Sequence, residues 1–389
     1  MPVPASLDDT LQDLAEASGR RLVVLDARQA VVAYSIHETG EDRERLSQLL
    51  ARPDQWTPPA GDLVEIQLPG IGDAAVLPLT DHRRRVGFLL TFLGDAAVDA
   101  RQLERLRSGA VTLGMLLSLR LLYAERDRSR ARELLSRVTG SDPVERRAAA
   151  GALVEEGHVG AASQYSAVAI GPDPRSIGPS GRTALAVEMT LEFVARSSTA
   201  TVVGSTLDDG TGILVFPRPV VGERLARILA DPRLKGVRAG IGPVVCSLAE
   251  ADRTFRLARR ALRATWLAPE GLALAAPWDE TGLDGLLALL PLEEMTPADL
   301  PRSVRRVLAA GLSPEVLQTL ESYLDCGGDA QRASQQLRVH RSTLYYRLGR
   351  IQRVLEADLH DGRLRAELHL GLRAARHLGS EAPAPTRTP

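Results

Sequence analysis

The pattern of apolar positions is clearest near the C-terminus, where residues 313–353 predict three short helices. The first helix begins at Pro314 and ends at Gly327 and Gly328, because glycine readily adopts the left-handed conformation that turns the chain after a helix. A tight turn at residues 338–340 separates the second helix from the third. The residues that recur at three- and four-residue spacing are Val316, Leu317, Leu320, Tyr323, Leu324, Ala330, Ala333, Leu337, Leu344, Leu348, Ile351 and Leu355.

The third helix, which begins at Arg341, leaves polar and cationic residues on its outer face. Its apolar residues fall within a narrow arc at about 100° per residue, so the remaining side chains point away from the core. No acidic residue occurs between Arg332 and Arg353, whereas this stretch holds six arginines. Such a field attracts phosphates and predicts a helix-turn-helix that binds double-stranded DNA. The candidate DNA-binding residues are His340, Arg341, Ser342, Thr343, Tyr345, Tyr346, Arg347 and Arg350.

These residues also carry a resemblance to a known family. Residues 319–352, TLESYLDCGGDAQRASQQLRVHRSTLYYRLGRIQ, resemble the C-terminal DNA-binding domain of the PucR/CdaR bacterial regulators, which is similar to the Fis-type helix-turn-helix. The shared features are a TLxxYL helix, a glycine corner and the motif VHRxTLxYRLxRI, and residues 363–378 resemble the closing helix of the family. Ser342 stands where the family most often has asparagine, and Tyr345 also departs from the pattern, so no base preference is implied. The domain is assigned to residues 312–379.

The central region, residues 161–278, alternates between strands and helices. Strands are predicted at 165–170, 200–205, 212–216 and 238–241, and helices at 183–195, 223–229 and 248–264. This order predicts an α/β sandwich in which helices cover one face of a sheet. Residues 238–264, RAGIGPVVCSLAEADRTFRLARRALRA, resemble the GGDEF-like central domain of the same regulator family.

The first 122 residues predict a small α+β domain of the GAF or PAS kind. An amphipathic helix is expected at 7–17, a hairpin at 21–26 and 30–34, and further strands at 63–68, 75–79 and 86–93. Such a domain either binds a small-molecule effector or serves as a dimerising scaffold. Its last helix, residues 99–123, carries an apolar stripe that either joins two subunits as a short coiled coil or packs on the domain's own sheet. The stripe consists of Leu103, Leu106, Ala110, Leu113 and Leu117.

The remaining segments connect these domains. A helical linker is predicted at 123–160, a helical connector at 279–311, and a disordered tail rich in proline, alanine and threonine at 380–389. The whole chain is therefore expected to be a multi-domain α+β protein with an all-α C-terminal helix-turn-helix.

Composition limits the class of protein. A chain of 389 residues with 44% hydrophobic residues is long enough for two or three cored domains, and a net charge of -1 means that the basic patch is local. The N-terminus lacks a signal-peptide pattern, and no apolar run approaches the roughly 20 residues of a membrane span, so a cytoplasmic location is expected. The two cysteines fit neither a disulfide framework nor a zinc ligand set.

Catalytic motifs are not evident. Asp208 and Asp209 precede a glycine in a turn sequence, and this hairpin lacks the GG[DE]EF motif that supplies metal-binding carboxylates in cyclases. We therefore expect no catalytic residue, cofactor or metal site, and a transcriptional regulator that binds operator DNA as a homodimer or higher homo-oligomer under the control of a small-molecule effector. Two alternatives remain open: a nucleotide-binding or cyclase-like signalling protein that uses the GGDEF-like domain, and a protein-interaction module without DNA affinity.

Overall fold

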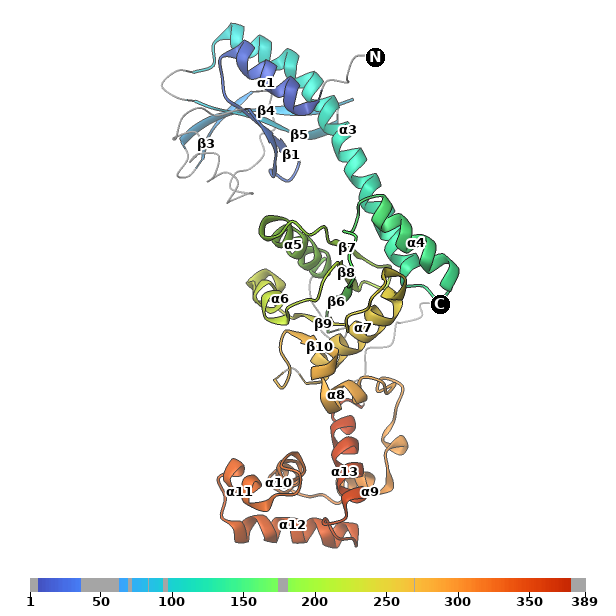
Figure 1. The fold of residues 1–389 in the computed structure, drawn as a ribbon. Coiled ribbons are helices and arrows are strands. Elements are labelled where there is room, and N and C mark those ends of the chain that lie inside the picture. The colour runs from blue at the N-terminus through green and yellow to red at the C-terminus, as the bar shows by residue number, and fades with distance from the viewer. Residues whose placement is uncertain are drawn as a thin grey trace, which may run out of the picture. The chain divides into compact units, whose positions relative to one another are not determined.

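The computed structural model describes residues 6–35, 63–68, 72–82, 84–93, 97–173, 181–268 and 270–378. The chain divides into two compact units, Met1–Ser129 and Arg130–Pro389, and each unit is described by itself (Figure 1). The tail predicted to be disordered, residues 380–389, lies outside the described residues.

A five-stranded antiparallel sheet forms the centre of the first unit, with the strand order β2-β1-β5-β4-β3. The strands are β1 (Leu22–Asp26), β2 (Val31–Tyr34), β3 (Val64–Leu68), β4 (Gly72–Asp81) and β5 (Arg84–Phe92). Helices α1 (Leu7–Ser18) and α3 (Ala100–Val138) contribute to the core on one face of the sheet. The predicted hairpin and the three further strands are confirmed, and the unit has the α+β composition expected.

The apolar stripe of α3 packs inside this unit. Leu106, Leu113 and Leu117 are almost fully buried in one core with residues of α1 and the sheet. The contact is close because Gly114 faces β4: a Cβ atom there would lie 2.4 Å from the carbonyl oxygen of Thr80. Of the two interpretations of this stripe, packing on the domain's own sheet is therefore confirmed.

The opposite face of α3 remains apolar and exposed. Val111, Met115, Leu119 and Leu122 are each at least 44% exposed. Their spacing of four, four and three residues places them on one side of the helix, away from the buried stripe. We call these four residues the outer stripe.

The second unit contains another five-stranded sheet, in the order β10-β9-β6-β8-β7. The strands are β6 (Ser166–Pro172), β7 (Val203–Thr206), β8 (Gly212–Phe216), β9 (Val237–Ile241) and β10 (Ala275–Pro277). The β9 and β10 pair is parallel, and the other pairs are antiparallel. The predicted pairing of the strands on either side of residues 207–210 is confirmed.

Helices cover both faces of this sheet, so the prediction that they cover only one face is wrong. Val168 and Ile170 pack with α5 (Arg182–Ser197) and α6 (Gly222–Leu229), whereas Ala167 and Ala169 pack with α7 (Ala251–Leu267). A strand buried on both sides has no alternation of apolar and polar residues, so its sequence does not tell how many faces are covered.

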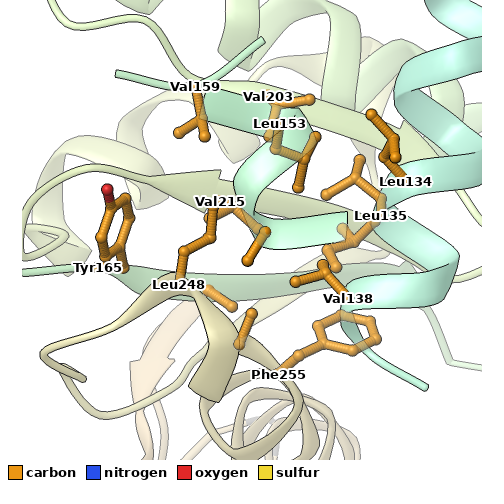
Figure 2. Close-up of a cluster of buried hydrophobic side chains, with 14 of the residues drawn as sticks. Leu134, Leu135, Val138, Leu153, Val159, Tyr165, Val203, Val215, Leu248 and Phe255 are labelled. Atoms are coloured by element: carbon orange, nitrogen blue, oxygen red, sulfur yellow. The ribbon is translucent and has the colours of Figure 1, made fainter. Parts of the chain in front are cut away.

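The end of α3 and helix α4 (Pro143–Glu155) complete the core on the α7 face. Figure 2 shows Leu135 and Val138 of α3 and Leu153 of α4 packed with residues of the sheet and with Phe255 of α7. Residues 130–155 are thus an integral layer of the central domain, and α3 runs without a break from the first unit into this layer.

The C-terminal part of the second unit is entirely helical. It contains α8 (Gly282–Leu287), α9 (Arg302–Ala309), α10 (Pro314–Asp325), α11 (Ala330–Leu337), α12 (Arg341–Leu355) and α13 (Gly362–Ala375). Short 3-10 helices occur at Pro232–Leu234, Leu248–Glu250, Trp278–Glu280 and Pro297–Asp299. None of the helices in the described part of the chain has both the length and the apolar content that a membrane crossing requires.

The contact between β9 and α7 depends on glycine, which yields a first prediction. A Cβ atom on Gly240 would lie 2.0 Å from the carbonyl oxygen of Ala258 and 2.2 Å from the backbone nitrogen of Leu262. We expect Gly240→Ala to lower the free energy of unfolding by about 1–3 kcal/mol, because the backbone of α7 must move away from the sheet. Urea unfolding followed by tryptophan fluorescence measures this change.

The matched control is Gly171→Ala on the neighbouring strand β6. A Cβ atom there would meet only Leu262 Cδ2, at 3.9 Å, which is an ordinary contact. The control should keep the urea midpoint of the wild type, and equal midpoints for the two variants would contradict the packing argument.

Candidate nucleic-acid interface

A glycine corner joins α10 to α11. Gly327 and Gly328 have φ angles of 68° and 88°, in the left-handed region, and the N–H of Gly328 donates to the carbonyl of Tyr323 at 2.9 Å. At Gly328 a Cβ atom would also lie 1.9 Å from Nη1 of Arg365, a side chain of α13. The two glycines therefore end α10 as predicted, and the second one also leaves room for the guanidinium of Arg365.

The turn between α11 and α12 is fixed by local hydrogen bonds. The Asp329 carboxylate accepts from two backbone N–H groups in the first turn of α11, and α11 ends at Arg338, whose φ of 54° is left-handed. Nδ1 of His340 then accepts from the N–H of Ser342 at 3.3 Å and caps α12. The predicted turn at residues 338–340 is confirmed, and His340 has a structural role in it.

One face of α12 is buried in the core of the helical domain. Leu344, Leu348, Ile351 and Leu355 are at most 6% exposed. They share a hydrophobic core with Val316, Leu320 and Tyr323 of α10 and with Ala333 of α11. The inner faces predicted from the spacing of apolar residues are therefore confirmed for all three helices.

The opposite face of α12 is exposed to solvent and carries most of the candidate residues. Ser342, Thr343 and Tyr346 are exposed, and Tyr346 is 66% exposed. Arg350 is half-buried on the same side. We call this surface, with Gly349 and Arg353, the outer face of α12.

Two arginines of α12 have no partner among the residues that the structure describes. The guanidinium groups of Arg341 and Arg350 make neither a hydrogen bond nor an ion pair there. Because no acidic residue lies between Arg332 and Arg353, their charge is not compensated by a neighbour in sequence. On and beside its outer face, α12 therefore carries uncompensated positive charge that favours an anionic partner.

Arg347 differs from these two arginines. Its Nη1 donates to Oγ1 of Thr319 at 3.2 Å and to the carbonyl of Glu315 at 3.4 Å, both on α10. Thr319 is fully buried, and its own hydroxyl donates to the carbonyl of Glu315 at 2.6 Å. In this structure Arg347 thus connects α12 to α10. Sequence reasoning did not select Thr319, although a polar residue between the apolar positions Val316 and Leu320 was a visible signal.

Arg341 and Tyr345 lie beside the outer face of α12. Together with Tyr323, Gln352 and His360 they line a hollow of about 270 Å³. The eight candidate residues therefore fall into four positions: the outer face, this hollow, the bond to α10, and the helix cap provided by His340.

In the β7–β8 hairpin, where a catalytic role for Asp208 and Asp209 was considered, the Asp209 carboxylate is bonded to neighbouring residues of the chain. The Asp209 carboxylate accepts from the N–H of Thr211 at 2.9 Å and pairs with Arg259 at 2.8 Å. Partial burial opposes ionisation, but the Thr211 hydrogen bonds and the charge of Arg259 lower the pKa of Asp209 below its ordinary value. Among the described residues, no group of three His, Cys, Asp or Glu side chains is placed to hold a metal ion.

The sequence of the segment that forms α10 to α13 matches a known domain family. Residues 316–374 match the PucR C-terminal helix-turn-helix domain. The C-terminal module is therefore a PucR-type helix-turn-helix domain. The match confirms the resemblance that the sequence of this segment showed, and a PucR-type helix-turn-helix domain indicates a DNA-binding transcriptional regulator.

Comparisons beyond the PucR-type domain give only distant likenesses. A regulator of polyketide synthase expression from Bifidobacterium adolescentis is 20% identical and has a TM-score of 0.31, with 64% of this chain and 98% of that chain covered. The E. coli DhaR(N)-DhaL complex is 13% identical with a TM-score of 0.21, covering 54% of this chain and 87% of that chain. Likenesses this weak carry no argument about this chain. No curated protein matches it.

The position of Arg347 in the PucR-type domain yields a second prediction. We expect Arg347→Ala to weaken the packing of α12 on α10 by about 1 kcal/mol, because the hydroxyl of Thr319 and the carbonyl of Glu315 lose a donor. Amide hydrogen exchange should then be about fivefold faster in residues 314–325 and 341–355.

The control for this experiment is Arg350→Ala, which removes the same charge from a side chain without a bond in the described residues. It should leave the exchange of both helices within error of the wild type. Unchanged exchange in Arg347→Ala would mean that the bonds to α10 do not stabilise the domain.

Proposed function

We propose that the chain is a transcriptional regulator that binds operator DNA by placing α12 in the major groove. The observation that carries this proposal is the exposed side of α12: the unpaired Arg350 and exposed hydroxyl groups on its outer face, the unpaired Arg341 beside that face, and no acidic residue from Arg332 to Arg353. A helix with these properties is complementary to base edges flanked by phosphates.

The positions of the side chains suggest a division of roles. Ser342, Thr343 and Tyr346 occupy the middle of the outer face and are proposed to lie near base edges. Arg341 and Arg350 are proposed to bind guanine edges or phosphates. Arg347 is proposed to hold α12 in place, because its guanidinium is already bonded to α10.

Useful sequence specificity requires two such modules, since one recognition helix contacts only a few base pairs. The outer stripe of α3 supports a homodimer. Its four apolar side chains are exposed on one side of a 39-residue helix, a pattern typical of a helix that pairs with a second copy. We propose that a small-molecule effector regulates the chain by changing the geometry of this dimer.

A third prediction tests DNA binding. The full-length protein should bind fragments from its own upstream region selectively, and its affinity should fall steeply as salt rises because bound counterions are released. The double variant Arg341→Ala/Arg350→Ala should lose at least tenfold in affinity. Fluorescence anisotropy at two salt concentrations measures both effects.

A charge-matched control shows whether a loss of DNA affinity comes from α12 itself or from the lower positive charge of the whole protein. Arg224→Ala/Arg227→Ala removes two exposed arginines from α6 in the central domain and should leave DNA affinity unchanged. The proposal fails if the wild type binds no DNA, or if both double variants lose affinity equally.

A fourth prediction tests the dimer. Met115→Glu/Leu122→Glu places two charges on the outer stripe and should convert a dimer to a monomer in light scattering after size exclusion, with weaker operator binding as a consequence. Val144→Glu, at an exposed position on α4, should remain dimeric. A dimer that persists in the double variant would exclude the outer stripe as the interface.

A further inference from the structure

A large pocket lies at the edge of the central domain, where α3 ends. Its walls come from the α3–α4 corner at residues 139–141, from α4, from Leu207 at the β7–β8 turn, and from α7. Its volume is about 600 Å³, which is within the range of about 300–1,000 Å³ that small-molecule sites occupy. Phe255 lines it, and Figure 2 shows this ring beside Val138 at the end of α3.

The pocket is strongly cationic. Four arginines line it, Arg146 from α4 and Arg256, Arg259 and Arg260 from α7, together with a single acidic residue, Asp252. All four arginines belong to the central domain, so this cluster is separate from the arginines of the helical domain. It is a local concentration of positive charge in a chain whose net charge is -1. We call it the arginine pocket.

Asp252 and Asp209 neutralise only part of this charge. Asp252 is shared by two arginines, because one of its oxygens lies 3.5 Å from Nε of Arg146 and the other lies 3.4 Å from Nη1 of Arg256. Arg259 pairs with Asp209 at 2.8 Å.

In the arginine pocket, the Arg260 guanidinium is unpaired among the described residues, and Arg146 has one buried N–H that makes no hydrogen bond. Arg260 is half-buried and makes no hydrogen bond or ion pair with any residue that the structure describes. Nε of Arg146 is buried and lies in an ion pair with Asp252 but makes no hydrogen bond in the described part of the chain, whereas Nη1 of the same guanidinium donates to the carbonyls of Gly140 and Ser141. A buried donor without a partner is costly, so an acceptor brought by a ligand would be favourable here.

We propose that the arginine pocket binds an organic phosphate of nucleotide size. Guanidinium groups match the geometry of phosphate oxygens and form strong charge-assisted hydrogen bonds with them. Arg260 and Arg256 bind the phosphate, the hydroxyl of Ser141 donates to it, and the apolar surface of Phe255 and Leu207 contacts the organic part.

The arginine pocket lies beside the end of α3, so a bound ligand can affect the position of this helix. α3 is one continuous helix, Ala100–Val138, and its last turns form a wall of the central core beside the pocket. A ligand that bridges the α3–α4 corner and α7 would hold the end of α3 in a fixed place. The helix that carries the outer stripe is thus covalently continuous with the wall of the arginine pocket.

Calorimetric titration of the full-length protein without DNA tests this site. ATP and GTP are the probes, and adenosine, guanosine and pyrophosphate are the comparison ligands at matched ionic strength. We expect saturable binding of at least one nucleotide, one per chain, with nucleosides inactive and pyrophosphate at least tenfold weaker. Nucleotide should also slow amide exchange in residues 139–146 and 252–260.

Variants of α7 locate the binding. Arg260→Ala, which breaks no bond in the described structure, should weaken nucleotide binding at least tenfold, whereas Arg253→Ala, an exposed arginine of the same helix outside the pocket, should not change it. Arg341→Ala/Arg350→Ala should bind nucleotide as the wild type does, which separates this site from the DNA-binding face.

Several outcomes would overturn the proposal. Absence of saturable binding by both nucleotides, or full affinity in Arg260→Ala, would exclude a phosphate site here. Pyrophosphate binding as tightly as a nucleotide would exclude a role for the organic part, and nucleoside binding would exclude the phosphate as the recognised group. Loss of nucleotide binding in Arg341→Ala/Arg350→Ala would place the binding on α12 instead.

Discussion

The packing of α12 on α10 is the contact on which the geometry of the helix-turn-helix domain depends. Leu344, Leu348, Ile351 and Leu355 fix the rotation of α12 about its own axis, and this rotation decides which side chains face outward. Replacing one such leucine by alanine typically costs about 2–5 kcal/mol, so this rotation is held firmly. The hydrogen bonds from Arg347 to α10 also stabilise this arrangement, because they oppose a shift of α12 along α10. The outer face of α12 keeps one orientation only because the buried face is fixed.

Close backbone contacts play the corresponding role in the central domain. β9 and the residue that follows it approach α7 so closely that Gly240 and Gly242 leave no room for a Cβ atom, and β6 is buried on both sides. A sheet enclosed in this way transmits displacement because a dense interior is not easily compressed. The end of α3 is part of this packed layer, so the helix that emerges from it has a rigid base.

The sequence predicted the parts of the fold that depend on local periodicity. The inner face of α12 and the glycine corner at Gly327 follow from neighbours a few residues apart. The sequence did not show which surface packs against the apolar stripe of α3, because periodicity shows that a face is buried but not what buries it. The bonds of Arg347 to Thr319 and the arginine pocket depend on contacts between segments far apart in the chain, which no spacing rule reveals.

The distribution of acidic residues explains why a nearly neutral chain can have a face suited to phosphate. In the helical domain, Arg373 pairs with Asp284 and Asp325, and Arg306 pairs with Glu356. Partial burial alone would lower the pKa of Arg373, but the two aspartates raise it and keep this arginine charged. Arg341 and Arg350 have no such partners in the described structure, and an unpaired cation at a surface costs little because water solvates it. The uncompensated positive charge at α12 therefore depends on where acidic residues are missing, and the number of arginines in the chain has little bearing on it.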